Sequence, residues 1–475
     1  MSLPGNLLRC LLIGCLAAGC TLRTTKPAAP ELPGSFDSAA PGASADWPSK
    51  DWYHGFASAE LDALILEAAQ NNFDVATARA RVAQADARAR QAHAAILPGV
   101  DAGGNANYLA GHSVNGSAHE TDWAALLSAS YEIDFWGKNR ANSNSARYLA
   151  VASRADRDTV ALTTLAGVAN GYFQVLSLRE RLTVARANAD AARALMDIVD
   201  SRFKAGLSNP VEVATQRAAL AAAEIAIPQL EQSQDEALSS LAVLLGRSPE
   251  GFKIEGAPLD SLKEPAVAAG LPSELLRRRP DIFMAEANLE SASSGLLAAR
   301  AALYPSLALT ASGGVQNPAL NAAILALSGV GPTLNLGASL AQPIFDGGRL
   351  RAARAEAEAR QQELTSSYRA AIVAALVDVE NSLSAIHHID AARDFQNDNV
   401  AQSERAFDGA RLRYKEGYGD FLAVLEAQKT LYSVRDLHIQ YRLARLQALV
   451  SLCKALGGGW EGPDAAVQPQ TAAVR

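Results

Sequence analysis

The sequence predicts a mostly α-helical chain that also contains a small amount of β-structure and is built as two internal repeats. Three observations lead to this prediction. Two very long stretches, about 139–206 and 349–416, are rich in alanine, leucine, arginine and glutamate, which are good helix formers. Four segments of about ten residues alternate between apolar and small polar residues, as strands do. The same landmarks recur in the same order in both halves of the chain.

The first twenty residues read as a secretory signal. A short segment ending at Arg9 is followed by an apolar stretch that is too short to span a bilayer. Small residues then lead to Cys20, a placement that resembles a bacterial lipobox, in which the thiol is acylated. We therefore expect a signal peptide over residues 1–19 and lipidation, including palmitate, at Cys20. Cys15 is a rival position, and an ordinary signal peptide with an incidental cysteine is a further alternative.

The two ends of the mature chain lack helical or strand periodicity. Residues 20–55 are rich in Pro, Ala and Ser, so we expect a lipidated N-terminal tether or a surface strap. Thr21 stands where lipoproteins retained at the inner membrane carry Asp, and this resemblance indicates the outer membrane. Residues 458–475 are similar in composition and are expected to form a C-terminal tail.

Composition excludes several kinds of protein. The net charge of −7 is mild and no run of Lys or Arg indicates a nucleic-acid partner. After cleavage only Cys20 and Cys453 remain, so neither a closed thiolate zinc site nor, once Cys20 is acylated, an intrachain disulfide is expected. We also expect no apolar stretch near 18 residues in the mature chain. In that case only strands, and no helix, could enter a membrane.

The repeats define the predicted domains. Repeat 1 covers residues 56–246 and repeat 2 covers 272–457, with an equatorial linker at 247–271 between them. In each repeat the order is a helix, a β-hairpin, a long helix and a shorter helix; the predicted ranges are about 99–136, 139–206 and 209–246, then about 306–345, 349–416 and 420–457. Both repeats close on Leu-Gly, at Leu245-Gly246 and Leu456-Gly457. Two copies are too few for a solenoid, which favours completion by oligomerisation.

Apolar residues in the long helices fall three and four positions apart, as in Leu162, Leu165 and Ala169. Such stripes require neighbouring helices, and the many alanines allow close backbone approach. Each helix would be roughly 100 Å long at its rise per residue. An ordinary elongated helical bundle is the alternative interpretation of these segments.

The alternating segments have one apolar side and one small polar side. The clearest runs from Ala125 to Phe135, and its length suits a tilted membrane crossing. We expect a longish polar loop in each hairpin, at about 110–122 and 316–332. A soluble sheet with one wet face would give the same alternation.

Four strands cannot close a barrel in lipid, and open sheet edges are forbidden in hydrocarbon. Three copies would supply twelve strands and would bring their long helices side by side as a helical tube. A homotrimer is therefore required if the strands lie in the membrane.

At this point the residues resemble a known family. The segment LPSELLRRRPDIFMAEANLESASSGLLAARAALYPSLALTASGG (residues 271–314), FDGGRLRA from Phe345, and the phrase at Arg413 are similar to the TolC-like outer membrane efflux proteins, in their lipoprotein branch of NodT or RND-type outer membrane factors. The resemblance covers about residues 50–460. It implies a trimeric channel-tunnel: a 12-stranded β-barrel in the outer membrane continuing into a long α-helical barrel with an equatorial belt. It also implies an exit duct for small molecules, opened by docking to a periplasmic adaptor and an inner-membrane pump of RND type.

A repeated phrase marks the candidate tip. RFKAG begins at Arg202 and RYKEG begins at Arg413, about 210 residues later. The resemblance places these helical turns at the pump-facing end, where the adaptor docks. Gly206 and Gly417 would allow the long helix to reverse. Pro210 after Asn209 would start the next helix in the first copy, and Asp420 would be the N-cap in the second.

The resemblance also implies a pore constriction at Leu422 and Glu426, which are four residues apart and share one helix face. Three copies would form an apolar ring and a carboxylate ring, and a carboxylate ring prefers cations. The alternative is an ordinary glutamate in a first helical turn, favoured by the helix dipole. Val211 and Thr215 hold the corresponding places in repeat 1, so only half of the tip carries the acid.

No constellation of catalytic residues is found, so we expect no enzyme activity and no cofactor. His387 and His388 are adjacent on a predicted helix and point apart, which argues against a metal site. The competing interpretation is a non-conducting periplasmic coiled-coil adaptor or scaffold lipoprotein. The strand hairpin inside each half favours the duct.

Overall fold

The structure is a computed structural model that describes residues 32–38, 47–113, 116–267, 270–316 and 331–462. The predicted signal peptide, Cys20 and the end of the tail lie outside these residues. The chain divides into two units. The first includes Ala83–Ala152 and Ala285–Tyr368, and the second comprises Pro30–Val82, Ser153–Met284 and Arg369–Arg475.

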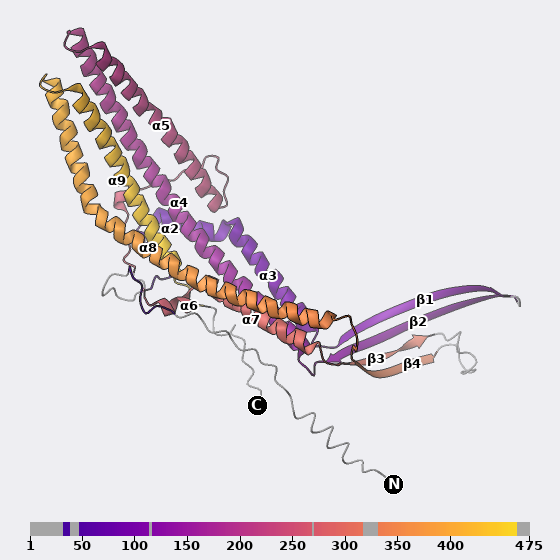
Figure 1. The fold of residues 1–475 in the computed structure, drawn as a ribbon. Helices are drawn as coiled ribbons and strands as arrows, with labels where there is room; N and C mark the ends of the chain where they lie inside the picture. Colours follow the sequence, from indigo (N-terminus) through magenta and orange to yellow (C-terminus); the bar gives the residue numbers. More distant parts are fainter. Residues whose placement is uncertain (1–31, 39–46, 114–115, 268–269, 317–330, 463–475) are drawn as a thin grey trace. The chain divides into compact units, whose positions relative to one another are not determined.

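Helices make up most of the described chain, with four strands between them, which confirms the prediction of a mostly α-helical chain with a small amount of β-structure. The elements in chain order are η1 (Trp52–Phe56), α2 (Ala59–Asn71), α3 (Phe73–Ala94), β1 (Gly99–Ser113), β2 (Gly116–Ile133), α4 (Lys138–Lys204), α5 (Pro210–Leu244), η2 (Leu259–Ser261), η3 (Pro272–Glu274), α6 (Leu275–Arg278), α7 (Pro280–Ala301), β3 (Ser306–Gln316), β4 (Gly331–Ala341), α8 (Arg349–Lys415) and α9 (Phe421–Ala455) (Figure 1).

The element order and the helix lengths repeat. Helices α4 and α8 each have 67 residues, and α5 and α9 each have 35. The predicted ranges of these helices ran up to two residues too far, because they included Gly206, Gly246 and Gly457. These glycines have positive φ and lie just past the helix ends.

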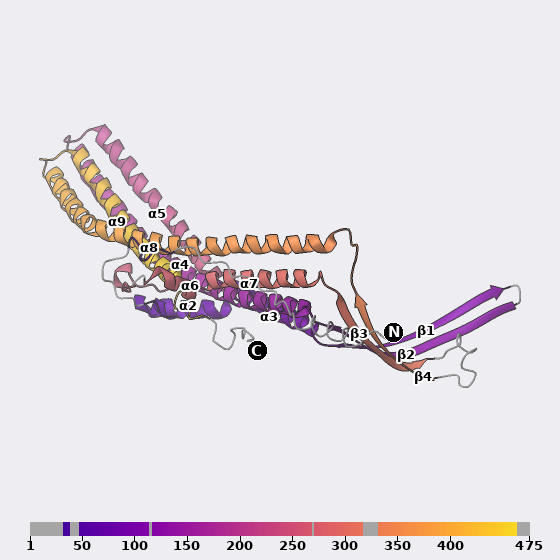
Figure 2. The same cartoon turned by 60° about the horizontal axis from the view of Figure 1, so that its bottom comes forward.

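The four strands form one antiparallel sheet in the order β1-β2-β3-β4, and they lie side by side in both views (Figures 1 and 2). The register aligns the apolar residues of all four strands. Ala125 pairs with Gly104 and with Val315, and Leu309 pairs with Tyr131 and with Ala338. Where all four strands pair, one face of the sheet is therefore apolar, and on β4 that face is exposed, with Leu336 76% accessible.

The first hairpin corrects the predicted loop at 110–122. Strand β1 continues to Ser113, β2 begins at Gly116, and these two residues pair with each other. Ladder hydrogen bonds satisfy the backbone of these polar residues, so the strands extend past the apolar alternation. Most of the loop predicted at 316–332 lies outside the described residues.

Part of the predicted tether belongs to the core of the second unit. Trp52, Tyr53 and Phe56 are buried in the largest hydrophobic cluster, together with Phe173 of α4 and Leu241 of α5. The tether predicted to end at residue 55 was therefore too long. Three large aromatic side chains stabilise this segment by burying their apolar area.

By length and composition, α8 contains one stretch that could cross a membrane, which corrects the expectation that the mature chain has none. This stretch, which was not identified from the sequence, consists of alanine and aliphatic residues that lie close together in the sequence of α8. One such helix is weak evidence of a span. Only 22% of that stretch is buried within the chain, so most of its surface faces away from it.

Two corresponding joints link helices end to end in the second unit. At Gly246, after α5, an added Cβ would overlap the carbonyl oxygen of Asn71, just before α3. At Gly457, after α9, an added Cβ would overlap the carbonyl oxygen of Arg278, just before α7. The repeated Leu-Gly landmark is therefore required by close backbone contact as well as by a positive φ.

Candidate functional site

The two tip turns have the same backbone geometry. Gly206 has a φ of 73° and Gly417 a φ of 87°, in the left-handed region. After Gly206, the amide of Leu207 donates to the carbonyl of Arg202 at 2.8 Å, and after Gly417, that of Tyr418 donates to Arg413 at 2.9 Å. Both long helices therefore end in a Schellman motif, which satisfies their last carbonyls.

The helices that follow the turns begin differently. Asn209 caps α5, since its Oδ1 accepts from the amide of Glu212 at 3.0 Å, and Pro210 is the first helical residue. Asp420 occupies the N-cap position of α9, but its side chain makes no capping hydrogen bond. Because Asp420 is exposed, water can solvate its carboxylate. Its charge acts on α9 only through the helix dipole.

A polar network joins the two tip turns of one chain. The Tyr414 hydroxyl at the end of α8 donates to Oε2 of Glu212 at 3.1 Å, and the Ser208 hydroxyl donates to the same oxygen at 2.7 Å. Arg202 donates to the carbonyl of Tyr414 at 3.1 Å, and its guanidinium lies 4.7 Å from the centre of the Tyr414 ring. Burial of the phenol and the charge of Glu212 raise the pKa of Tyr414 above its ordinary value of 10.0.

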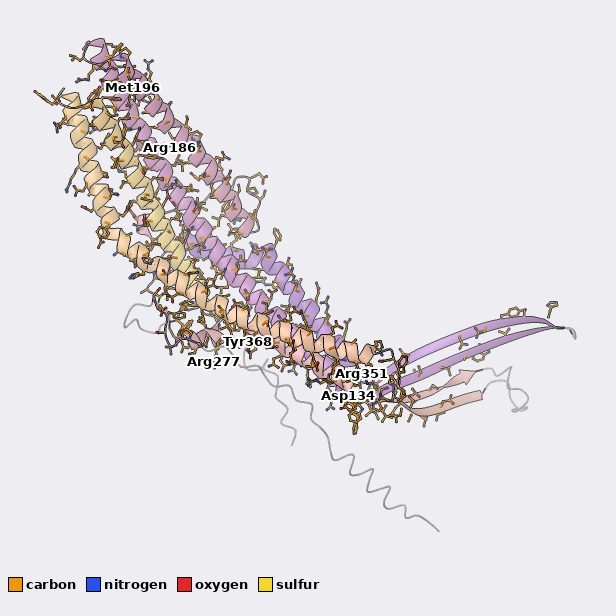
Figure 3. The ribbon with its side chains drawn as sticks, in the orientation of Figure 1. Asp134, Arg186, Met196, Arg277, Arg351 and Tyr368 are labelled. Atoms are coloured by element: carbon orange, nitrogen blue, oxygen red, sulfur yellow. The ribbon has the colours of Figure 1, made fainter. Side chains whose placement is uncertain are left out.

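Apolar packing supports this network. Tyr414 and Phe421 are buried with Leu195, Met196 and Val424 in one cluster that draws on α4, α5, α8 and α9. Met196 is labelled on α4 in Figure 3. Arg202, Tyr414 and Glu212 of the polar network are therefore placed by packed helices, whereas Ser208 belongs to the turn between α4 and α5.

Leu422 and Glu426 lie on the opposite side of α9 from this cluster. Both are exposed, with Leu422 63% accessible, whereas Val424 and Leu425 between them are buried. The chain therefore brings the two predicted constriction residues to one free face. Val211 at the corresponding place in α5 is also exposed.

Polar side chains also set the order of the long helices in this unit. Gln216 of α5 donates to the carbonyl of Ala192 on α4 at 2.8 Å, and Gln428 of α9 donates to that of Asn188 on α4 at 3.3 Å. Helices α8 and α9 are joined by the ion pair of Arg445 with Asp390. Above the tip turns the order is therefore α5, α4, α9, α8, with α5 and α8 at the two edges; at the turns themselves, α8 also contacts α5 through Tyr414 and Glu212.

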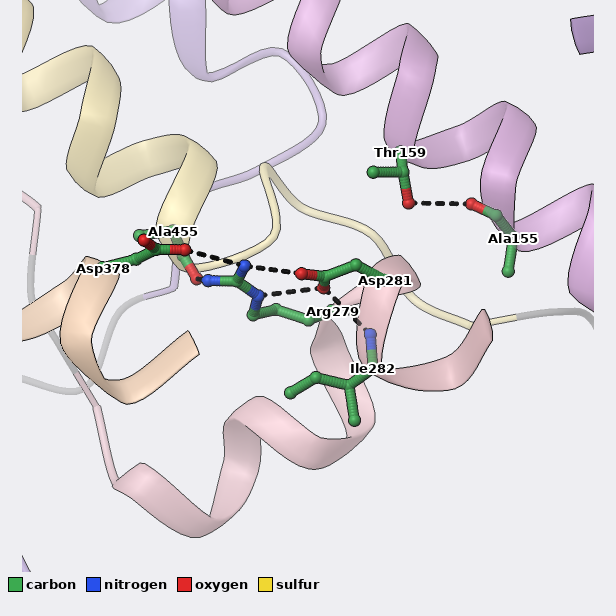
Figure 4. Close-up of polar contacts among 7 residues, drawn as sticks. All are labelled: Ala155, Thr159, Arg279, Asp281, Ile282, Asp378 and Ala455. Carbon is green, nitrogen blue, oxygen red and sulfur yellow. Dashed lines mark hydrogen bonds and ion pairs between the residues drawn. The ribbon is translucent and has the colours of Figure 1, made fainter. Parts of the chain in front are cut away.

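The segment that carried the strongest family resemblance builds the joint between α9 and α7 (Figure 4). Buried Arg279 donates to Asp281 at 2.6 Å, to Asp378 of α8 at 3.0 Å and to the last helical carbonyl of α9, at Ala455, at 3.0 Å. Burial opposes the charge on this guanidinium, but the hydrogen bonds and charges of the two aspartates outweigh it and raise the pKa of Arg279. A cavity of about 400 Å³ opens beside this cluster and is lined by Thr159, Ser382 and Ser451 among others.

The sequence predicted that Arg202, Gly206, Arg413 and Gly417 lie at the two turns. It did not identify Tyr414 and Glu212 as residues that join these turns. Two signals could have identified them. The aromatic residue after each repeated arginine predicts a stacking partner, and Asn209 followed three residues later by Glu212 is a capping pattern. Among the residues that the structure describes, no group of three or more His, Cys, Asp or Glu side chains could hold a metal ion.

Comparison with known proteins gives one family. The profile described as outer membrane efflux protein matches residues 64–247 and 271–458, one match in each half of the chain. The two matched ranges cover most of both predicted repeats.

Individual proteins resemble the chain over almost its whole length. It is 45% identical over 421 residues to the pyoverdine export outer membrane protein OpmQ of Pseudomonas aeruginosa, covering 87% of this chain and 88% of that one. It is 28% identical over 448 residues to the cation efflux system protein CusC of an Escherichia coli O6:H1 strain, covering 93% and 96%. The solved outer-membrane channel OprN is 25% identical and superposes with a TM-score of 0.85, covering 93% of this chain and 100% of that one.

Proposed function

The chain belongs to the outer membrane efflux protein family, and from this premise we propose that three copies form a passive exit duct for small molecules across the outer membrane. The duct is the outer membrane component of a tripartite efflux system. It opens when its tip docks to a periplasmic adaptor and an inner-membrane pump of RND type. The observation that carries this proposal is the four-stranded sheet, which has one apolar face and two unpaired edges within the chain.

The sheet supports a homotrimer. Strands β1 and β4 each pair on one side only, so a single sheet would expose backbone N–H and C=O groups to lipid. Three copies joined edge to edge supply twelve strands and close the cylinder, with the apolar faces toward lipid and the small polar residues inside.

The helices support the same assembly. Helices α5 and α8 form the two edges of the helical layer in one chain, and most of the apolar stretch of α8 is not buried there. Joining α8 of one copy to α5 of the next covers this surface and continues the layer into an α-helical barrel.

We assign the tip constriction to Leu422 and Glu426. In a trimer, three leucines and three glutamates meet near the threefold axis, one helical turn apart. The carboxylate ring favours cations, and its self-repulsion is relieved when the tip opens or a cation binds. The network around Tyr414 holds the tip closed, and docking of the adaptor at the turns of Gly206 and Gly417 displaces it.

Cargo selection is assigned to the pump. One relative exports pyoverdine and another belongs to a cation efflux system, so the same kind of duct serves chemically different cargo. The duct itself performs no chemistry and uses no cofactor. Acylation of Cys20 would anchor each copy to the outer membrane in addition to its strands.

Planar-bilayer recording tests the proposal. Protein purified in detergent should be trimeric and should conduct ions after insertion, with rare openings at rest. A trimer that never conducts, with or without Glu426→Ala, would support the competing interpretation of a non-conducting adaptor or scaffold lipoprotein. A stable monomer in detergent would contradict both the barrel and the constriction.

A further inference from the structure

The repeated tip phrase places an arginine directly before an aromatic residue twice, as Arg202-Phe203 and Arg413-Tyr414. Within one chain, the arginine of the first repeat contacts the aromatic residue of the second repeat. Arg202 lies over the Tyr414 ring at 4.7 Å and donates to the carbonyl oxygens of Tyr414 and Leu207 at 3.1 and 3.4 Å. One of the two possible arginine–aromatic pairs is therefore complete.

The other pair, Arg413 and Phe203, is incomplete in the chain. Both side chains are exposed, with Phe203 43% accessible. Among the described residues, the Arg413 guanidinium has no hydrogen bond, ion pair or ring contact. Both residues nevertheless lie in the same backbone setting as the completed pair, in the last turn of a 67-residue helix that ends in a Schellman motif.

We propose that Arg413 of one copy lies over the Phe203 ring of the next copy, and that this contact closes the tip between copies. The inference rests on the proposed trimer. Inside the chain, Arg202 of the first tip turn contacts Tyr414 of the second tip turn. If the second turn contacts the first turn of the neighbouring chain in the same way, the result is a head-to-tail contact. A head-to-tail contact closes into a ring when the rotation is suitable. The tip then consists of six long-helix ends with alternating contacts within and between copies.

The two kinds of contact differ in strength. Within the chain, the Tyr414 hydroxyl also donates to Glu212 at 3.1 Å, which adds a charge-assisted hydrogen bond. Between copies this bond cannot form, because Phe203 has no hydroxyl and Ala423 stands where Glu212 stands in the first repeat. The contact between copies is therefore the weaker of the two and breaks first when the tip opens.

Cross-linking tests the contact directly. The double variant Phe203→Cys/Arg413→Cys, treated with a short bismaleimide in detergent, should give covalently linked dimers and trimers on a denaturing gel. The matched control is Phe203→Cys/Leu412→Cys, since Leu412 is also exposed, at 60%, but points about 100° away around α8. The buried native Cys453 should not react, because burial raises the pKa of its thiol to about 12.

Conductance tests what the contact does. Phe203→Leu removes the π-face but keeps an apolar side chain, whereas Phe203→Tyr keeps the face. Because three contacts are lost per tip, Phe203→Leu and Arg413→Gln should each raise the resting conductance about tenfold, and Phe203→Tyr should leave it unchanged.

Two results would overturn the inference. The first is a conducting trimer in which 203/413 yields no more linked product than the 203/412 control. The second is a Phe203→Leu channel whose resting conductance equals that of the unmodified protein. In either case the proposed duct would stand, because the unmodified trimer would still conduct. A monomeric, non-conducting protein would instead contradict the duct and this inference together.

Discussion

At the scale of single residues, Arg279 shows how one side chain can hold a helix joint. Its guanidinium connects the N-terminal end of α7, the last turn of α9 and Asp378 of α8. In the corresponding joint of repeat 1, Asn72 does the same with an amide, donating to the carbonyl of Leu244 at 2.8 Å and accepting from the amide of Val75 at 3.0 Å. Different residue types therefore fulfil one role in the two repeats.

Replacing Arg279 by alanine should destabilise the protein strongly. The change leaves a buried carbonyl and two carboxylates without their donor, and a broken buried pair costs about 3–5 kcal/mol. Because Asp378 is 54% accessible, we expect the lower end, about 3 kcal/mol. Arg279→Lys should recover part of this, since an ammonium cannot match the planar fork. Denaturant unfolding in detergent measures the change in free energy of unfolding.

The neighbouring Arg277→Ala is the control for this experiment, because Arg277 is exposed. It should lie within about 0.5 kcal/mol of the unmodified protein. An equal effect of Arg277→Ala and Arg279→Ala would contradict the assigned role.

Tyr414 should make the closed tip sensitive to alkaline pH. The pKa of its phenol in the folded tip is raised above 10.0, chiefly by burial and then by Glu212. A raised pKa means that the neutral phenol contributes to the closed state below pH 10 and that this contribution is lost as pH rises through the folded value. Resting conductance in planar bilayers should therefore increase above about pH 10.

Two variants separate this effect from general alkaline damage. Tyr414→Phe should show a raised resting conductance already at neutral pH, with no further step at alkaline pH. Tyr418→Phe, at a position that is 83% accessible, should behave like the unmodified protein. A step that persists in Tyr414→Phe would assign the titration to another group.

At the scale of elements, the internal repeat predicts how strands of neighbouring copies pair. The hairpin registers correspond: Gly99 opposite Ser130 in the first hairpin matches Ser306 opposite Ala341 in the second. The pairing of β2 with β3, which joins the repeats, can therefore serve as the template for pairing β4 with β1 of the next copy. Because Ser128 pairs with Ser312 inside the chain, we expect Ser339 to lie opposite Asn105 of the neighbouring copy.

Disulfide formation checks this register. Oxidised Ser339→Cys/Asn105→Cys should link copies to each other, whereas Ser128→Cys/Ser312→Cys should form a bond within the chain and run as a monomer. Ser339→Cys/Asn107→Cys reports a slip of two residues on the same face. Faster linking of 339 to 107 than to 105 would show that the repeat does not set the register.

At the scale of the whole molecule, Glu426 should decide the ion selectivity of the duct. Three carboxylates in a narrow neck attract cations, so Glu426→Gln should lower the cation-to-anion permeability ratio severalfold. Reversal potentials in a salt gradient measure it. Thr215→Ala, at the corresponding position of repeat 1, is the control and should leave the ratio unchanged. An unaltered ratio in Glu426→Gln would exclude the carboxylate ring.

The sequence by itself determined the fold class, the two repeats and the alternation of the strands. These features depend on local periodicity, which is written in consecutive residues: 3.6-residue stripes for α4 and α8, and a two-residue period for β1 to β4. The turn glycines Gly206 and Gly417 were equally readable, because a left-handed turn restricts the residue type locally.

Only the tertiary structure decided which distant residues meet. The contact of Tyr414 with Glu212, the bonds of Arg279 to Ala455 and Asp378, and the full length of the first hairpin each depend on pairing between segments that are not neighbours in sequence. A hydrogen bond between such segments leaves no period in the chain, since each partner is an ordinary polar residue until packing places it. The helices and strands could therefore be predicted from the sequence, whereas the contacts between distant side chains could be identified only in the tertiary structure.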